Sequence, residues 1–348
     1  MKSLRRVTGL LLLLLALASP LRAAENLSIF DPVSPSGSAI RHVFVLVLAI
    51  TGGIFVLVEG ILIYSLVMFR RRGTPDGTEP PQVYGSLPIE IAWTVGPALV
   101  VFVLVLIMIR TELEVQVDPN RPPPGSRPLY VTVKGHQWWW EYIYERNDGK
   151  KLELITANEL HVPASDAKTP RPVYLTLLSV DVCHSFWVPR LAGKTDLIPG
   201  RTNHMWFQTD QPGTYLGQCA EYCGTQHANM LLRVIVDTPA AFERWLADEM
   251  KDAVDNPAVR KQRDVFLAQS CVNCHRIRGT PAKGTFGPDL THLMSRETLA
   301  SGMVPNTRAN LRQWIRDPQK IKPGCLMPDM KLSENEVDQV LDYLLTLR

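Results

Sequence analysis

Two cysteines, a glutamate, a histidine and a methionine lie close together in the segment GQCAEYCGTQHANM, which covers residues 217–230. Neighbouring thiols in an exported chain tend to form a disulfide unless a metal keeps them as thiolates. The pattern C-x3-C-x3-H-x2-M offers two thiolates, an imidazole and a thioether, and such soft ligands suit copper or zinc. A thioether favours copper, to which it is a common weak axial ligand. Two coppers that share both thiolates would each need an imidazole, so a second histidine must come from elsewhere in the fold.

A structural zinc site and a disulfide are the alternatives for this cysteine pair. Neither of them accounts for Met230 or for the separate segment SVDVCHSFWVP, which ends an apolar strand with His184. His184 is therefore the candidate for the second imidazole.

A second motif, CVNCH, covers residues 271–275. It is the haem-attachment pattern of c-type cytochromes, in which Cys271 and Cys274 form thioethers and His275 becomes an axial ligand. Half of a zinc site is the alternative, but no second cysteine pair follows. The sixth iron ligand is expected to be a methionine, which raises the reduction potential. The candidates in this part of the chain are Met294, Met303, Met327 and Met330.

The N-terminal end predicts export. A basic start, a leucine run and the small residues Ala23 and Ala24 indicate a secretory signal peptide over residues 1–24. An uncleaved anchor is the alternative, because Leu21 or Arg22 would stand three residues before the cut.

Residues 41–110 predict a transmembrane hairpin with spans at about 43–69 and 91–109, both long enough to cross a bilayer. The loop between them opens with three arginines, and positive charge beside a span favours the cytoplasmic side. The mature N-terminus and everything after Arg110 are therefore expected outside.

Four segments are expected after the hairpin. Residues 118–128 are rich in proline, which lacks a backbone donor, and predict a stiff linker. Residues 129–237 are rich in β-branched and aromatic residues with turn signals between them, which predicts a small all-β sandwich or barrel. Residues 238–256 predict a connecting helix, and residues 257–348 predict short helices joined by Gly/Pro loops.

The chain resembles subunit II of the haem–copper oxidases, specifically that of cytochrome c oxidase with a class I cytochrome c domain fused to its C-terminus. The resemblance covers residues 44–237 and rests on D-V-x-H-S-F-W-V-P, C-x-E-x-C-x3-H-x2-M, GHQWWWEY, KTDLIPGR and the two-helix hairpin. It implies a cupredoxin-like fold that holds CuA, a dinuclear copper centre. Carried over position by position, the copper ligands are His184, Cys219, Cys223, His227, Met230 and the backbone carbonyl of Glu221.

The resemblance also implies roles for three further side chains, each with an ordinary alternative. The Glu221 carboxylate would help to bind magnesium at the boundary with the catalytic subunit, or would simply be solvated. Trp138 would be the point where electrons enter, or a core aromatic residue. Glu90 would lie near the mouth of a proton channel in the partner subunit, or be an interfacial carboxylate.

The loop KPGCLMPDM, just before the last helix, resembles the methionine loop of class I cytochromes c. This resemblance favours Met327 as the sixth ligand, with Met330 as the alternative. Cys183 and Cys325 stand where the families have an apolar or small residue, and we expect both to be buried free thiols, which behave as small apolar side chains.

The expected function is electron transfer in a respiratory terminal oxidase, from the fused c-type haem to CuA and on to subunit I, where oxygen is reduced to water. The expected partners are subunit I, subunit III and a donor such as a cytochrome c or a quinol–cytochrome c reductase, in a bacterial inner membrane with the C-terminal domains on the periplasmic side. The net charge of +3, without a basic run interleaved with aromatic residues, gives no argument for nucleic-acid binding. The alternatives are the small subunit of a CuA-containing nitric oxide reductase and a copper-binding assembly or storage protein.

Overall fold

The computed structural model describes residues 27–70, 82–116, 121–145, 151–166 and 168–348. The expected signal peptide lies outside the described residues, and the expected proline-rich linker lies partly outside them.

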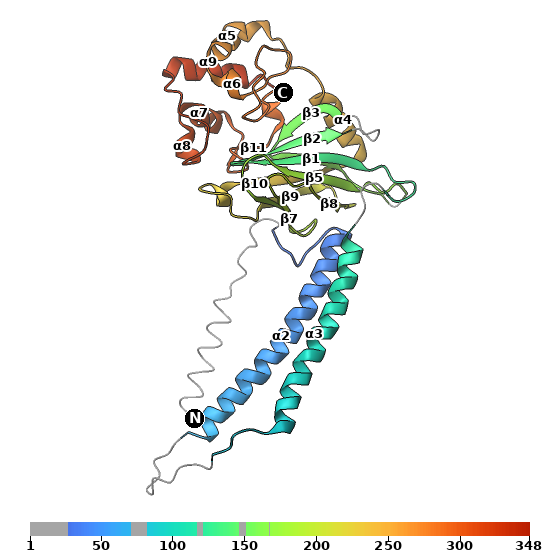
Figure 1. Cartoon of the computed structure of the whole chain (residues 1–348). Helices are drawn as coiled ribbons and strands as arrows, with labels where there is room; N and C mark the ends of the chain where they lie inside the picture. Colours follow the sequence, from blue (N-terminus) through green and yellow to red (C-terminus); the bar gives the residue numbers. More distant parts are fainter. Residues whose placement is uncertain (1–26, 71–81, 117–120, 146–150, 167) are drawn as a thin grey trace, which may run out of the picture. The chain divides into compact units, whose positions relative to one another are not determined.

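Two long helices, α2 (Pro35–Met68) and α3 (Leu87–Val115), occupy the N-terminal part of the described chain (Figure 1). The mean hydropathy of their most apolar stretches is 2.5 and 2.6, and these stretches are not buried by the protein. A helix this apolar on every side needs an apolar solvent, and 29 residues or more exceed the roughly 20 that a bilayer requires. Both helices begin before the expected spans, and α3 also ends beyond its span.

The middle of the chain folds into two five-stranded sheets that pack face to face (Figure 1). One sheet has the strand order β3 (Lys151–Ala157), β2 (Trp139–Glu145), β1 (Leu129–His136), β5 (Val173–Ser179) and β8 (Asn203–Phe207). The other has the order β4 (Glu159–Pro163), β10 (Leu231–Asp237), β9 (Gly213–Cys219), β6 (His184–Trp187) and β7 (Thr195–Leu197). We call this unit the sandwich domain.

Alternation along the strands builds the core of the sandwich domain. In β10, Leu232, Val234 and Val236 are buried while the residues between them are partly exposed, as a strand with one core face requires. Trp140 and Phe186, from different sheets, meet edge to face in this core with ring centroids 5.6 Å apart. The all-β expectation is confirmed.

Helix α4 (Pro239–Glu249), which lies in the segment expected to be a connecting helix, packs on the sandwich domain. Thr238 caps its start by accepting a hydrogen bond from the backbone N–H of Ala241. Phe242 is buried in the sandwich core, and Trp245 stacks on His161 of β4 with ring centroids 4.3 Å apart. The chain leaves the sandwich only after this helix.

The remaining chain forms a helical domain around a core of its own. Its elements are η2 (Pro257–Val259), α5 (Arg260–Ala268), α6 (Cys271–Cys274), η3 (Leu293–Ser295), β11 (Thr298–Leu299), β12 (Val304–Pro305), α7 (Arg308–Arg316), α8 (Pro318–Ile321) and α9 (Glu334–Leu344). A capping box between Ser333 and Glu336 begins α9. Buried Val337, Val340 and Leu341 recur at helical spacing and face the core that α9 forms with α5 and α7. We call this unit the helical domain.

Candidate functional site

The loop between β9 and β10 brings two sulfur atoms together inside the sandwich domain. Cys219 is the last residue of β9, and its Sγ lies 3.8 Å from the Sγ of Cys223. The two residues are 4% and 2% exposed. Two free sulfurs at this distance, shielded from water, form a soft donor pair ready for a metal.

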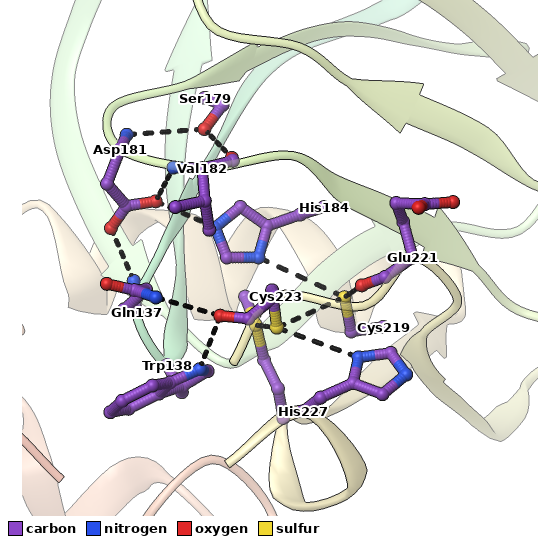
Figure 2. Close-up of polar contacts among 11 residues, drawn as sticks. Gln137, Trp138, Ser179, Asp181, Val182, His184, Cys219, Glu221, Cys223 and His227 are labelled. Atoms are coloured by element: carbon purple, nitrogen blue, oxygen red, sulfur yellow. Dashed lines mark hydrogen bonds and ion pairs between the residues drawn. The ribbon is translucent and has the colours of Figure 1, made fainter. Parts of the chain in front are cut away.

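Two imidazoles reach the sulfur pair from different elements, and Figure 2 shows both rings directed at it. Strand β6 pairs with β9, so His184 at the start of β6 places its Nδ1 3.9 Å from the Sγ of Cys219. The short helix η1 (His227–Asn229) places the Nδ1 of His227 3.6 Å from the Sγ of Cys223. Each sulfur therefore has an imidazole of its own.

A thioether and a carbonyl complete the group. The Sδ of Met230, whose side chain is fully buried, lies 3.8 Å from the Sγ of Cys223. The backbone oxygen of Glu221 lies 3.2 Å from the Sγ of Cys219. The ligand atoms of His184, Cys219 and Cys223 all lie within 4.8 Å of one another. This donor set of sulfur and imidazole fits copper.

The closeness of the two sulfurs shifts the pKa values of the two cysteines in opposite directions. The pKa of Cys219 lies well below its usual value, chiefly because of the hydrogen bond between its sulfur and that of Cys223. The pKa of Cys223 is raised in turn by its hydrogen bond with Cys219. Deprotonation of Cys223 would also place a second negative charge beside the Cys219 thiolate. A bound cation would replace the Cys223 proton.

Asp181 orients His184, a role that the sequence analysis did not assign although the residue lies in the matched motif. Its Oδ1 lies 2.8 Å from the Nε2 of His184, which leaves Nδ1 to face the sulfurs (Figure 2). Burial alone would raise the pKa of Asp181, but hydrogen bonds from His184 and from the backbone N–H groups of Val182 and Gln137 hold it below its usual value. Such a carboxylate fixes both the tautomer and the ring orientation of a metal-binding histidine.

Gly135 in β1 leaves the space that this imidazole needs. A Cβ at this position would come within 2.7 Å of the Cδ2 of His184. Because that atom belongs to a fully buried ring, a side chain at Gly135 would displace it from the sulfur pair.

Trp138 connects the sulfur pair to a second part of the protein. Its indole Nε1 donates a 3.0 Å hydrogen bond to the backbone oxygen of Cys223, and the side-chain amide of Gln137 donates to the same oxygen (Figure 2). Trp138 is only 9% exposed, and it also lines a cavity shared with the helical domain.

This cavity, with a volume of about 300 Å³, contains the CVNCH motif in its wall. The Nδ1 of His275 lies 2.8 Å from the backbone oxygen of Pro288, which leaves Nε2 free to bind iron. Burial lowers the pKa of His275, which favours the neutral ring that a metal ligand requires. A Cβ at Gly287 would come within 2.7 Å of this ring. Two cysteines, an oriented histidine and an apolar cavity fit a covalently attached haem.

Met327 and Met330 both line this cavity, so its walls do not by themselves decide between them. The loop that carries Met327 is held from α8, since the side-chain amide of Gln319 donates hydrogen bonds to the backbone oxygens of Cys325 and Met327.

The other residues singled out from the sequence have varied surroundings. The side chain of Glu221 is exposed, and Glu90 accepts a 3.3 Å hydrogen bond from the backbone N–H of Ser86 at the start of α3. The expectation of burial is wrong for Cys183, which is exposed because it precedes His184 at the start of β6 and points away from the core. Cys325 is half-buried.

The apolar helices, the sulfur–imidazole group and the cavity with its haem-attachment motif define a membrane-anchored electron-transfer protein. Three sequence profiles agree with this class. "Cytochrome C oxidase subunit II, transmembrane domain" matches residues 23–110, "Cytochrome C oxidase subunit II, periplasmic domain" matches residues 129–237, and "Cytochrome c" matches residues 260–348.

Similar proteins carry matching names. Cytochrome c oxidase subunit 2 of Alkalihalophilus pseudofirmus is 35% identical over 329 residues, which are 93% of this chain and 92% of that protein. Cytochrome c oxidase subunit 2 of Bacillus subtilis is 30% identical over 311 residues, 83% of this chain and 82% of that protein. The crystal structure of the periplasmic domain of subunit II of cytochrome oxidase from Bradyrhizobium japonicum is 30% identical, covers 35% of this chain and 92% of that one, and has a TM-score of 0.30.

The chain belongs to the cytochrome c oxidase subunit II family, in a form with a C-terminal cytochrome c domain. It is a membrane protein with a periplasmic domain, and it serves electron transfer in a terminal oxidase together with the catalytic subunit I. The family implies copper, and the cytochrome c domain implies haem.

Replacing Asp181 with alanine should lower the copper affinity of the full chain by about 10- to 100-fold, the usual cost of losing the partner that orients a metal-binding histidine. Copper titration of the purified protein measures the effect. Asp196→Ala, at an exposed position in β7, is the matched control. Equal copper affinities in the two variants would show that Asp181 does not orient His184 for metal binding.

Proposed function

We propose that the group around the sulfur pair is the CuA site, with two coppers held by Cys219, Cys223, His184, His227, Met230 and the backbone oxygen of Glu221. The proposal is supported by the convergence of these six donors from the start of β6, the end of β9, the loop after it and a short helix. Zinc does not explain the thioether, and a disulfide does not explain sulfurs that lie 3.8 Å apart.

The proposed haem attachment uses Cys271 and Cys274 for the thioether bonds and His275 as the proximal ligand. Met327 is the proposed sixth ligand. Its loop lines the same cavity as His275, and the hydrogen bonds from Gln319 restrain its backbone. When bound, the haem and the copper pair would each accept and release one electron.

The protein side chains provide a short connection between the two sites. Trp138 lines the haem cavity and donates its indole N–H to the backbone oxygen of Cys223. The copper-binding side of this connection is buried and rigidly hydrogen-bonded, so little in it must rearrange when charge moves. We infer that electrons reach the copper site from the fused haem by way of Trp138, which is too buried for a soluble protein to touch directly.

Several finer assignments accompany this proposal. The membrane is a bacterial inner membrane, the further partner is subunit III, and the donor to the haem is a cytochrome c or a quinol–cytochrome c reductase. The exposed carboxylate of Glu221 would bind magnesium at the boundary with subunit I, since carboxylates suit that ion. Glu90 would lie near the mouth of a proton channel in subunit I.

The observation that carries the proposal is the pairing of each sulfur with its own imidazole. The test is to isolate the complex that copurifies with this chain and to measure consumption of oxygen and of nitric oxide. We expect a haem–copper catalytic subunit and oxygen consumption. Nitric oxide consumption without oxygen consumption would replace the oxidase with a nitric oxide reductase.

Replacing Cys223 with serine should abolish the mixed-valence signal of the dinuclear copper site, because serine cannot serve as a bridging thiolate. The absorption spectrum of the haem should not change, because the haem is attached in the other domain. Cys183→Ser is the control, since Cys183 is exposed and outside the sulfur pair. A mixed-valence signal that survives in Cys223→Ser would contradict the copper assignment.

Replacing Met327 with alanine should lower the haem reduction potential by a sizeable part of the roughly 0.8 V range that axial ligands span. Redox titration followed at the haem bands measures the shift. Met330→Ala should leave the potential near its original value. The reverse pattern would make Met330 the sixth ligand.

A further inference from the structure

The sandwich domain and the helical domain are joined by buried polar contacts as well as by the chain. Besides the hydrogen bond from Ser295 to Glu249 at the end of α4, two segments of the helical domain make such contacts, residues 297–302 and residues 322–324. The first segment contacts strands β4 and β10 of the sandwich domain, and the second contacts Trp138 and the sulfur-bearing loop.

The first contact is made by a carboxylate of the sandwich domain. Glu159, the first residue of β4, is 3% exposed. It accepts hydrogen bonds from the backbone N–H of Glu297 at 2.9 Å, from the backbone N–H of Thr298 at 2.8 Å and from the hydroxyl of Thr298 at 2.5 Å. All three donors belong to the helical domain, so a buried charge of one domain depends on the other domain for its hydrogen bonds.

The second contact is made by a charged side chain of the helical domain, which binds backbone groups of the sandwich domain. Lys322 of the helical domain is also 3% exposed. Its Nζ donates to the backbone oxygens of Trp138 at 2.8 Å, Asn229 at 3.0 Å and Ala300 at 3.2 Å. Two of these carbonyls belong to the sandwich domain. Burial lowers the pKa of Lys322 to about 7, whereas the three carbonyls match the three N–H donors of the ammonium form.

The backbone of the helical domain adopts an unusual shape at this interface. Ala300 and Ser301 have φ angles of +56° and +62°, and Gly302 follows with +85°. Non-glycine residues in this region are strained and persist only where their surroundings hold them. Here the backbone N–H of Leu231 donates to the oxygen of Ser301, and the Ser301 hydroxyl donates to the oxygen of Leu231.

Lys322 is linked directly to the proposed electron connection. The backbone oxygen of Trp138 accepts from Lys322, and the indole of the same tryptophan donates to the backbone oxygen of Cys223. Lys322 and Trp138 also line the haem cavity together. Moving this ammonium would therefore move the cavity wall that faces the copper site.

We propose that Glu159 and Lys322 form an interdomain clamp that positions the haem cavity against Trp138. They are positioning residues, because each acts through the orientation of the two domains. The inference rests on the proposed function in one respect, because the clamp fixes the arrangement of the haem cavity and the copper site between which electrons are proposed to pass.

Each half of the clamp can be removed from a different domain. Lys322→Met leaves three buried carbonyls without their donor, and Glu159→Gln sets an amide N–H against a backbone N–H. The controls are Lys320→Met, at an exposed lysine of α8, and Glu243→Gln, at an exposed glutamate of α4. Two variants in separate domains keep the test valid if one of them fails to fold.

The first measurement is hydrogen exchange in the isolated full complex, with the copper signal and haem spectrum checked for each variant. In both clamp variants, residues 297–302 should exchange about tenfold faster or more, because loss of a buried hydrogen-bond partner shifts the docking equilibrium by about that factor. The controls should match the unmodified protein. Unchanged protection in both clamp variants would overturn the proposal.

The second measurement is the rate of electron transfer from haem to copper after rapid reduction of the haem. It should be independent of ionic strength in the unmodified protein, because the buried contacts are shielded from salt. In the clamp variants it should fall about tenfold or more with both cofactor spectra unchanged, in proportion to the docked fraction. Faster exchange with an unchanged rate would overturn the positioning role. If the unmodified protein shows no transfer, the proposed function fails, while hydrogen exchange still decides whether the clamp exists.

Discussion

The distance of 3.8 Å between two buried sulfurs sets the conditions that the rest of the molecule meets. Two thiolates this close in a medium of low polarity repel each other strongly unless a cation shares their charge. The pairing of β6 with β9 brings His184 to the sulfur pair from inside the sandwich, and the short helix η1 supplies the second imidazole, His227. Asp181 and Gly135 then fix where one ring lies, so that the site depends on residues from both sheets.

Much of this arrangement could be predicted because it is local in sequence. The spacing within residues 217–230 brings the sulfur ligands into one loop, and the apolar composition of the two long helices needs no partner to be recognised. Long-range consequences of packing could not be predicted. Glu159 and Lys322 are single charged residues in ordinary surroundings, and their contacts cross 139 and 184 residues of chain. Burial was wrongly expected of Cys183, because the face opposite His184 at this strand start is exposed to solvent rather than packed.

The interface between the sandwich domain and the helical domain lies beside both proposed cofactor sites. Trp138 follows β1 and contacts the sulfur-bearing loop through its side chain and the helical domain through its backbone. One residue therefore belongs to the wall of both cofactor sites. The polar character of the interface follows from this arrangement. Backbone carbonyls and amides near the sites are already held by the sheets, and a single buried charged side chain can bind several of them at once.

The packing of α4 on the sandwich domain has a consequence for how far the helical domain can travel. Trp245 and Phe242 anchor that helix, so only residues 250–256 separate its end at Glu249 from the next helical turn at Pro257. Seven residues reach at most about 25 Å when fully extended. A helical domain released from the sandwich would remain tethered by this short linker, at a local concentration in the millimolar range. The linker therefore keeps the helical domain near the sandwich domain, whereas the contacts between the two domain surfaces set its orientation.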